Sequence, residues 1–396
     1  MPKAMEGIRI LEAGQRLAGP MVGMLLGDLG AEVIRYEEPT RGDPLRHAYT
    51  PLINGVGPYF LWTARNKKSI TLDTRQKRGQ EIFKELVRIS DVVTENFRPG
   101  TMAKWGLAYE DLKKVNSKII MLSVSMYGHS GPYSRRGGVD HIAQAASGLM
   151  SVTGEPDGPA TFYGIALVDY VAGLLNTYAV QAALYHREKT GEGQWIDNSL
   201  FDSAVWLMEH KILQYTYLGE VAWRKGSRGL SPLERSYPAQ DGDVFIMAGI
   251  RRGDVLTAIG REDVKEDPRY PKNPRDPVEY EFLEMCGQVL AEWTRTRTVK
   301  EIMDTLLAAD IMAAPVNTVA DAVDDPHWLA RGNLVSVEHP DLGTLKFQAT
   351  PPKFSRTQAT VETPPPRLGE HNQYVYGQLL GLSQEEIKRL KEERVI

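Results

Sequence analysis

The chain is poor in cysteine, because Cys286 is the only one among 396 residues. A single cysteine excludes an internal disulfide and any metal or iron–sulfur site that is built from several cysteines. Cys286 lies among apolar neighbours in the helix-like pattern 280–290. We therefore expect a buried structural thiol rather than a nucleophile, and the reducing cytoplasm is the compartment that fits this composition best.

Long apolar runs and an excess of charge of one sign are also missing. The most apolar stretch, 168–184, is interrupted by Asp169, Asn176 and Gln181, so it falls short of the ~20 apolar residues of a membrane span. Residues 1–7 lack the layout of a signal peptide. Lysine and arginine number 47 against 51 aspartates and glutamates, with no basic block. The sequence thus predicts neither a membrane nor a nucleic acid as partner.

Three familiar ligand-binding patterns are absent. Gly14, Gly19, Gly23 and Gly27 do not form the G-x-G-x-x-G fingerprint of dinucleotide sites, and no G-x-x-x-x-G-K-[ST] phosphate loop occurs. The eight histidines show no H-E-x-x-H or other paired metal-ligand spacing. A nicotinamide or ATP enzyme is therefore not expected, and we predict no bound metal and no permanently bound cofactor.

Short apolar strands alternate with helices in the first half of the chain. Residues 8–13 resemble a buried strand, 21–29 a helix that begins after Pro20, and 31–37 a second strand, which together form one β-α-β unit. The alternation continues with strands at 69–72, 91–95 and 118–124, a helix at 79–89 and a helical zone at 166–201. This pattern predicts an α/β fold with a doubly wound parallel sheet.

A change of texture near residue 237 indicates a domain boundary. The segment 237–246 contains Asp241-Gly242, a dipeptide typical of hairpin turns. A chain of 396 residues is also long enough for two domains. We therefore expect a second, smaller domain after the parallel sheet.

Charged and polar groups gather at three places next to the expected elements. Cations at 65–68 and 75–78 flank one strand, as an anionic phosphate ligand would require, with a solvated charged face as the alternative. Asn96, Phe97 and Arg98 follow another strand, at the edge where open α/β sheets bind ligands. Asp169 begins a helix rich in small residues. A helix N-terminus would keep this carboxylate ionised, and a simple N-cap is the alternative role.

The order of these segments resembles that of a known family. Motifs of the class III CoA-transferases match, in order and with similar spacing, residues 14–20, 65–73, 95–100, 164–169, 190–194 and 368–372. This family includes the formyl-CoA, carnitine and bile-acid CoA transferases and the 2-methylacyl-CoA racemases. The resemblance runs from about Gly7 to Ile396.

The resemblance implies a particular domain organisation. A large Rossmann-like domain, formed by both chain ends, is joined to a smaller α/β domain. By this resemblance the large domain comprises residues 1–220 and 335–396, and the small domain with its linkers comprises residues 221–334. Two chains of this family form an interlocked dimer, so we expect a homodimer, with a heteromer of related chains as an alternative.

Asp169 matches the catalytic aspartate of the family. An ionised carboxylate, with an ordinary pKa of about 3.9, can attack an acyl-CoA thioester without a general base. The resemblance implies an aspartyl anhydride and then an aspartyl-CoA thioester, so that CoA passes from a thioester to a free carboxylic acid without ATP. Backbone N–H groups at Gly164, or at Gly137 and Gly138, would stabilise the oxyanions. Succinyl-CoA is the donor that the resemblance suggests.

Positions that contact coenzyme A in the family map mostly onto the ends of strands. They are Leu17, Ala18, Leu72, Asp73, Arg75, Asn96, Phe97, Arg98 and Lys104. Two positions depart from formyl-CoA transferase, because Leu17 stands where that enzyme has a glutamine and Glu38 where it has an arginine. For the acyl group and the acid we expect contacts from Gln15, Tyr127, Gly138, Tyr163 and Arg251.

Two other functions remain open. A 2-methylacyl-CoA racemase needs a histidine in a Gly-His-Asp motif as one acid/base partner, and this chain reads Gly138-Val139-Asp140-His141 there. The side chain of valine cannot donate or accept a proton, so racemisation requires that His141 reach the site. The chain could also be the CoA-binding subunit of a heteromeric transferase, although Asp169 and the CoA motifs argue for an active chain.

Overall fold

Two compact units divide the chain. The computed structural model describes residues 3–49, 51–229, 231–249, 251–271 and 278–396. Unit 1 comprises Met1–Leu149, Phe162–Tyr217 and His327–Ile396, and unit 2 comprises Met150–Thr161 and Leu218–Pro326. Unit 1 therefore holds residues from both ends of the chain, and each unit has a hydrophobic core of its own.

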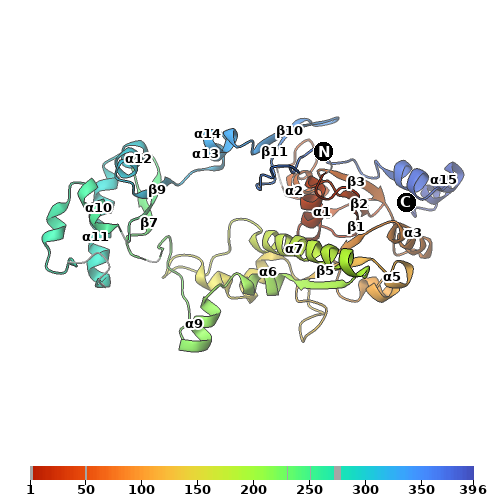
Figure 1. Cartoon of the computed structure of the whole chain (residues 1–396), viewed down its shortest axis with the longest axis horizontal. Coiled ribbons are helices and arrows are strands. Elements are labelled where there is room, and N and C mark those ends of the chain that lie inside the picture. The colour runs from red at the N-terminus through yellow and green to blue at the C-terminus, as the bar shows by residue number, and fades with distance from the viewer. Residues whose placement is uncertain (1–2, 50, 230, 250, 272–277) are drawn as a thin grey trace. The chain divides into compact units, whose positions relative to one another are not determined.

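A parallel sheet of six strands forms the centre of unit 1 (Figure 1). Its order is β3-β2-β1-β4-β5-β6, and all neighbouring strands are parallel. The strands are β1 (Arg9–Glu12), β2 (Glu32–Glu37), β3 (Lys67–Thr71), β4 (Val92–Glu95), β5 (Ile120–Ser125) and β6 (Trp195–Ser199). The predicted parallel α/β sheet is confirmed.

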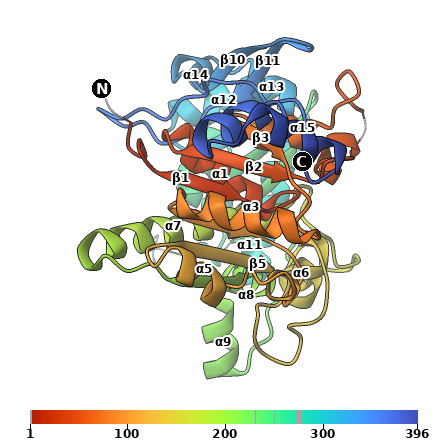
Figure 2. The same cartoon turned by 90° about the vertical axis from the view of Figure 1, so that its right-hand side faces the viewer.

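Both faces of this sheet are covered, which explains why its inner strands are apolar at consecutive positions. In β1, Leu11 belongs to one core and Ile10 to the other, because successive residues of a strand point to opposite faces. Helices α3 (Lys77–Arg88) and α5 (Tyr109–Val115) contribute to the first core, and Figure 2 shows α3 in front of the strands. The second core contains residues of α1 (Ala18–Asp28), α7 (Leu167–Thr190) and α8 (Leu200–Trp206).

The expectation of one helical zone over 166–201 is wrong, because the chain forms a helix, a turn and a strand there. Helix α7 ends at Thr190, where Gly191 adopts a φ of 76° and caps the helix. A Cβ at Gly193 would lie 2.0 Å from the carbonyl oxygen of Ile119, so only glycine fits at this crossing. The following strand β6 pairs with β5 at the edge of the sheet. Its sequence, Trp-Ile-Asp-Asn-Ser, has no apolar run that would predict a strand.

The C-terminal segment returns to unit 1. The hairpin of β10 (Leu334–His339) and β11 (Gly343–Gln348) shares a hydrophobic cluster with α2 (Pro58–Thr63). Helix α15 (Gln384–Glu392) lies beside α3 (Figure 1), where Arg78 and Glu386 form an ion pair of 2.9 Å. Val375, Tyr376, Ile387 and Leu390 join the core that α3 covers. Residues from both chain ends therefore share one core.

Unit 2 has an antiparallel sheet in the order β7-β8-β9, with β7 (Arg235–Pro238), β8 (Asp243–Met247) and β9 (Met312–Pro315). The Ala239 N–H donates to the carbonyl of Gly242 at 2.8 Å, which confirms the hairpin turn at Asp241-Gly242. Helix α11 (Tyr280–Arg295) carries Cys286, whose side chain is buried in the core as predicted. Burial raises the pKa of this thiol to about 11, so it is protonated at neutral pH.

Shorter elements complete the described residues. The remaining α-helices are α4 (Thr101–Lys104), α6 (Asp140–Ala146), α9 (Lys211–Leu218), α10 (Arg252–Ala258), α12 (Val299–Ala308), α13 (Val319–Val323) and α14 (Pro326–Ala330). Turns of 3-10 helix occur at Pro44–His47, Leu149–Val152 and Glu262–Glu266, and Gln373–Leu379 forms a π-helical segment. Within the described ranges, no helix has both the length and the apolar character that a membrane span requires.

Candidate active site

A cavity of about 660 Å³ lies at the carboxyl ends of β1, β4 and β5 in unit 1. The strand order reverses between β1 and β4, and open α/β sheets bind ligands at such a switch point. Several residues that the sequence singled out line this cavity, namely Gln15, Leu17, Ala18, Asn96, Phe97, Arg98, Gly138 and Asp169. The structure thus brings segments near residues 15, 96, 138 and 169 to one place.

Two hydrogen bonds join the loops on either side of the switch point. The Gln15 N–H donates to Oδ1 of Asn96 at 2.7 Å, and Nδ2 of Asn96 donates to the Gln15 carbonyl at 2.7 Å. This reciprocal pair requires an amide at position 96, because a carboxylate has no N–H to donate. Asn96 therefore fixes the loop after β1 against the loop after β4.

Asp169 lies in the first turn of α7, whose N-cap is Ala166. A second carboxylate, that of Asp140, occupies the end of this helix. Its Oδ2 accepts hydrogen bonds from the backbone N–H groups of Val168 at 2.7 Å and of Asp169 at 3.0 Å. Gln144 donates a side-chain hydrogen bond to Oδ1 of Asp140. Asp140 is buried. Its carboxylate occupies helix N–H groups that could otherwise stabilise the Asp169 carboxylate.

The charge state of Asp169 differs from the expectation of a firmly ionised carboxylate. Burial of the carboxyl raises its pKa to about 7, the charge of Asp140 raises it further in the same direction, and the charge of Arg16 opposes the shift. The expectation is wrong because Asp140, not Asp169, accepts the helix N–H groups. Asp169 is also not an N-cap, since it is the third residue of the helix.

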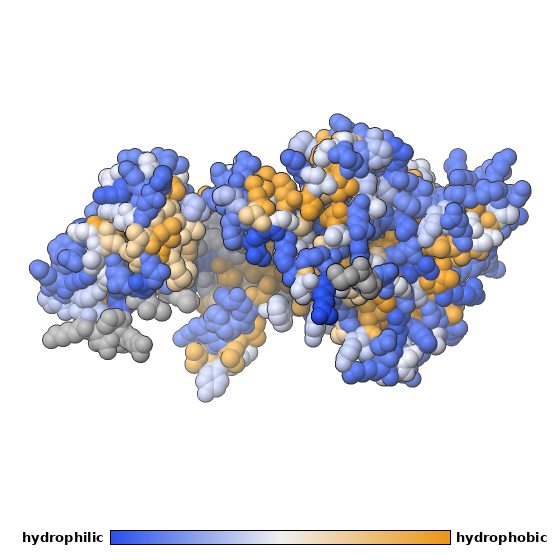
Figure 3. Space-filling view, turned by 45° about the horizontal axis from the view of Figure 1, so that its top comes forward, coloured by the Kyte–Doolittle hydropathy of each residue, from blue (hydrophilic) through white to orange (hydrophobic). Residues whose placement is uncertain are grey.

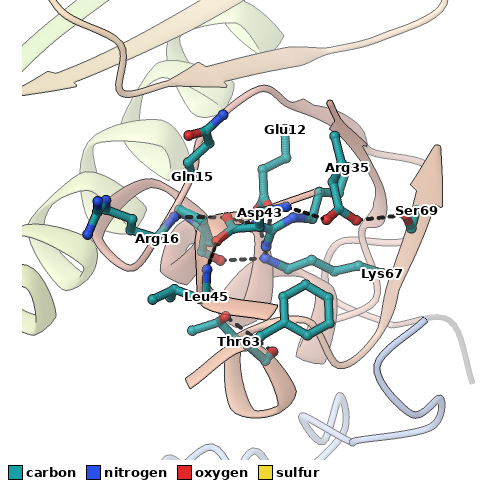
Figure 4. A network of polar contacts seen from close by, with 12 residues as sticks. Glu12, Gln15, Arg16, Arg35, Asp43, Leu45, Thr63, Lys67 and Ser69 are labelled. Carbon is teal, nitrogen blue, oxygen red and sulfur yellow. Dashed lines mark hydrogen bonds and ion pairs between the residues drawn. The ribbon is translucent and has the colours of Figure 1, made fainter. Parts of the chain in front are cut away.

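A network of buried charges lies beneath the loop after β1 (Figure 4). Lys67 donates to Glu12 at 2.7 Å, and NH1 of Arg35 lies 3.4 Å from Glu12. Arg35 also pairs with Asp43, whose Oδ2 accepts the backbone N–H of Arg16 at 2.9 Å. Glu12, Arg35, Asp43 and Lys67 are all buried, so each charge depends on its partners. The network therefore fixes the backbone of Arg16 through its hydrogen bond to Asp43.

The cations at 65–68 do not form the expected phosphate site. Arg65 is buried and pairs with Asp28 at 2.7 Å, and Lys67 is buried in the network with Glu12. Lys68 pairs with Glu32 at 3.1 Å. The prediction is wrong because the carboxylates that neutralise these cations come from other segments, which a local reading of charge cannot identify. The cations at this end of β3 stabilise the fold instead.

Other residues assigned to CoA lie outside the cavity that contains Asp169. Arg75 lines a neighbouring cavity of about 690 Å³ together with Gln15 and Glu38. It pairs with Asp73 at 2.7 Å and with Glu38 at 3.4 Å. Leu72 is buried in the core of unit 1. Lys104 is exposed at the end of α4 and lines neither cavity.

Only some of the predicted substrate residues line the cavity that contains Asp169. Gln15 and Gly138 line the cavity of Asp169, whereas Tyr127 packs against Phe201 with a ring distance of 5.6 Å. Tyr163 is exposed, and its N–H donates to Oε1 of Gln144 at 2.8 Å. Arg251 belongs to unit 2 and pairs there with Asp254 at 2.9 Å and with Asp310 at 2.7 Å.

Two residues of the site escaped the sequence analysis as functional groups. In the sequence, Asp140 is only part of a motif beside Val139, and Arg16 is only part of the segment 14–20. Asp140 carries one local signal, since an acidic residue in the first turn of a short helix is common at helix starts. Its contact with the N-terminus of α7, 28 residues away, has no signal in one sequence. Among the described residues, no cluster of histidine, cysteine, aspartate and glutamate has the arrangement of a metal site.

The contact between Asp140 and Asp169 predicts the effect of a substitution. In Asp140→Asn, the pKa of Asp169 should fall from about 7 towards the ordinary aspartate value, because the neighbouring negative charge is lost. A carbon-13 NMR titration of aspartate-labelled protein, with Asp169→Asn to identify the resonance, measures this. Asp197→Asn is the control, because the Asp197 carboxylate accepts the His129 N–H and no N–H of α7. The pKa of Asp169 should not change in this variant. An unchanged pKa in Asp140→Asn would show that burial alone sets it.

Comparisons with known proteins identify the family. The family model for CoA-transferase family III matches residues 5–372. The chain is 35% identical over 401 residues to a succinyl-CoA–D-citramalate CoA-transferase of Chloroflexus aurantiacus, covering 100% of this chain and 98% of that protein. It is 34% identical to a succinate–glutarate CoA-transferase of Agrobacterium fabrum, covering 95% of each.

A solved structure agrees with these sequence relatives. The crystal structure of a CAIB/BAIF family protein from Brucella suis superposes with a TM-score of 0.85 at 32% identity, covering 96% of this chain and 100% of that chain. The match extends over both sequence and fold, and it includes the segments that carry the site. The chain therefore belongs to CoA-transferase family III and is a CoA-transferase.

Proposed function

We propose that this enzyme moves CoA from succinyl-CoA to a free carboxylic acid through covalent intermediates on Asp169. The observation that carries the proposal is the shared cavity, in which Asp169 lies with Asn96, Phe97 and Arg98 at the switch point of the sheet. The relatives reported above are named for succinyl-CoA or succinate, which supports the choice of donor.

The chemistry is an exchange of acyl groups on one carboxylate. The Asp169 carboxylate attacks the thioester carbonyl and expels CoA thiolate, which gives a mixed anhydride of Asp169 and the donor acid. The thiolate then attacks the Asp169 carbonyl, which gives an aspartyl-CoA thioester and releases the donor acid. The acceptor carboxylate attacks this thioester and expels the thiolate, which finally attacks the acceptor carbonyl. The new thioester leaves, and Asp169 is again a carboxylate. A thioester is broken and a thioester is formed, so no ATP is consumed.

Two features of the cavity support this sequence of steps. Gly137 and Gly138 line it, and their backbone N–H groups are the proposed donors to the oxyanion. An Asp169 pKa of about 7 leaves a substantial fraction ionised at neutral pH. It also makes this carboxylate more basic than an ordinary aspartate, and a more basic oxygen is a better nucleophile. Activity should rise with pH through about 7, because only the ionised form attacks.

The proposed CoA-binding region includes the residues that line the two neighbouring cavities. Leu17, Ala18, Asn96, Phe97 and Arg98 line the first, and Arg75 lines the second. In this proposal the large CoA-binding domain, residues 1–220 and 335–396, is Rossmann-like, and residues 221–334 form the small domain. The strand order of unit 1 supports the first assignment, because the same order occurs in dinucleotide-binding folds.

The racemase alternative finds less support in the site. Val139 lines the cavity and has no proton to exchange. The ring of His141 packs edge-on against Phe162 with a centroid distance of 4.6 Å. His141 does not line the cavity that contains Asp169. We therefore favour transfer over racemisation.

Trapping of the intermediate tests the proposal. Wild-type protein is incubated with succinyl-CoA, quenched with hydroxylamine and analysed by peptide mass spectrometry. The peptide containing Asp169 should carry a hydroxamate, because hydroxylamine attacks an activated aspartyl group. Asp169→Asn should lose both the modification and at least about a thousandfold of the transfer activity.

The control for this experiment is Asp157→Asn, which removes an exposed carboxylate of unit 2. This variant should be modified at Asp169 like the wild type. If no donor modified Asp169 in protein that binds CoA, covalent transfer would be contradicted and the heteromeric-subunit interpretation would gain support.

We also propose that the enzyme acts as an interlocked homodimer in the cytoplasm. Large apolar side chains are exposed along α7 to α9, including Leu174, Tyr178, Trp206, Leu213 and Tyr217. Figure 3 shows hydrophobic patches within a surface that is otherwise mostly hydrophilic. Apolar surfaces of this kind are typical of subunit contacts. The single cysteine, buried and unpaired, supports the cytoplasm.

Native mass spectrometry of the chain expressed alone tests the assembly. A homodimer should have about twice the chain mass of 44.2 kDa. Dilution should not release monomer readily, because interlocked chains must unfold in part to separate. A monomer would contradict the homodimer and would direct the search to a related partner chain.

A further inference from the structure

Arg16 has a constrained backbone and an unpaired side chain. Its φ of 63° lies in the left-handed region, which residues other than glycine, asparagine and aspartate rarely adopt. Its N–H donates to Asp43 at 2.9 Å. Asp43 is buried and is itself paired with Arg35. Such a conformation persists only where its surroundings determine it, and here the buried network supplies that constraint (Figure 4).

The guanidinium of Arg16 points away from the network that holds its backbone (Figure 4). Arg16 is exposed and lines the cavity that contains Asp169. Within the described residues, its guanidinium has neither a hydrogen-bond nor an ion-pair partner. The charge of Arg16 acts on the Asp169 carboxyl, so the two groups share one electrostatic environment.

Two other arginines, Arg98 and Arg136, line the same cavity. Arg136 stacks on the ring of Tyr133, with its guanidinium carbon 3.8 Å from the ring centroid. Arg98 belongs to the segment assigned to CoA, and its guanidinium lies against Gly137. Among the described arginines that line this cavity, Arg16 is the one whose charge acts on Asp169, so it is placed to meet a substrate anion there.

We propose that Arg16 binds the remote carboxylate of dicarboxylic substrates, and thereby selects acyl donors and acceptor acids that carry a second carboxylate. This inference rests on the proposed function and names the substrate class of the same site. A guanidinium matches a carboxylate through two parallel N–H donors. Acyl groups of monocarboxylic acids, such as butyryl, have no second carboxylate that the Arg16 guanidinium could bind.

The remote carboxylate is a better partner for Arg16 than the reacting one. The reacting carboxylate loses its charge when it becomes an anhydride or a thioester, whereas the remote carboxylate keeps its charge in every step. A contact that is equally strong throughout lowers KM without raising kcat. Arg16 is thus a specificity-determining residue, and its loss should raise KM for dicarboxylic substrates more than it lowers kcat.

The test compares two thioether analogues that bind but cannot react, carboxypropyl-CoA and butyl-CoA. In Arg16→Gln, affinity for carboxypropyl-CoA measured by calorimetry should fall by about 10- to 100-fold, and affinity for butyl-CoA by less than about 3-fold. Arg16→Gly should behave like Arg16→Gln, because both remove the guanidinium and glycine adopts the positive φ without strain. Arg16→Lys should retain part of the selectivity.

Arg135→Gln is the matched control. It removes one positive charge from an exposed residue that does not line the cavity, and selectivity should not change. Equal losses for both analogues in Arg16→Gln, or no loss for either, would overturn the proposal. These outcomes are independent of covalent catalysis. Failure to trap Asp169 would contradict the proposed function, and unchanged selectivity in Arg16→Gln would contradict only the role of Arg16.

Discussion

The buried charges beneath the loop after β1 are the constraint on which the site depends. Glu12 at the end of β1 pairs with Arg35 of the adjacent strand β2 and with Lys67 of β3, and Arg35 also pairs with Asp43. Four buried charges of both signs are tolerated only because each is paired, and removal of one would leave its partner buried and uncompensated. The result is a fixed backbone at Arg16, directly beside the Gln15–Asn96 contact that joins β1 to β4.

On this fixed edge, two carboxylates take different roles because their surroundings differ. Asp140 accepts the backbone N–H groups of Val168 and Asp169 at the start of α7. Asp169, the third residue of the same helix, has no such donors among the described residues and experiences both burial and the charge of Asp140. The same contact that orders the helix end therefore makes Asp169 a stronger base. The charge of Arg16 opposes this rise in the pKa of Asp169, and an anion bound to Arg16 would weaken that opposition.

The sequence predicted the parts that depend on local pattern or on a resemblance. The β-α-β alternation predicted the parallel sheet, and Asp241-Gly242 predicted a hairpin that the structure contains. The motifs placed Asn96 to Arg98 and Asp169 among the site residues, and the structure brings them to one cavity. Contacts between distant segments were not predictable. The cations at 65–68 looked like a ligand site because Asp28, Glu12 and Glu32 lie far away in sequence. Asp140 could not be linked to α7 for the same reason.

The central claim is that Asp169 forms covalent intermediates with both acids. Labelling the acceptor acid with oxygen-18 tests this claim directly. Each turnover should transfer one oxygen of the acceptor acid to Asp169, because the acceptor oxygen that bridges the anhydride stays on Asp169 when CoA thiolate attacks the acceptor carbonyl. The enzyme is therefore incubated with succinyl-CoA and a dicarboxylic acceptor labelled with oxygen-18, and the peptide containing Asp169 is weighed by mass spectrometry. The account predicts label on Asp169 after turnover, and on no other carboxylate. Turnover that left Asp169 unlabelled would show that CoA moves without the aspartyl intermediates, and would contradict the account.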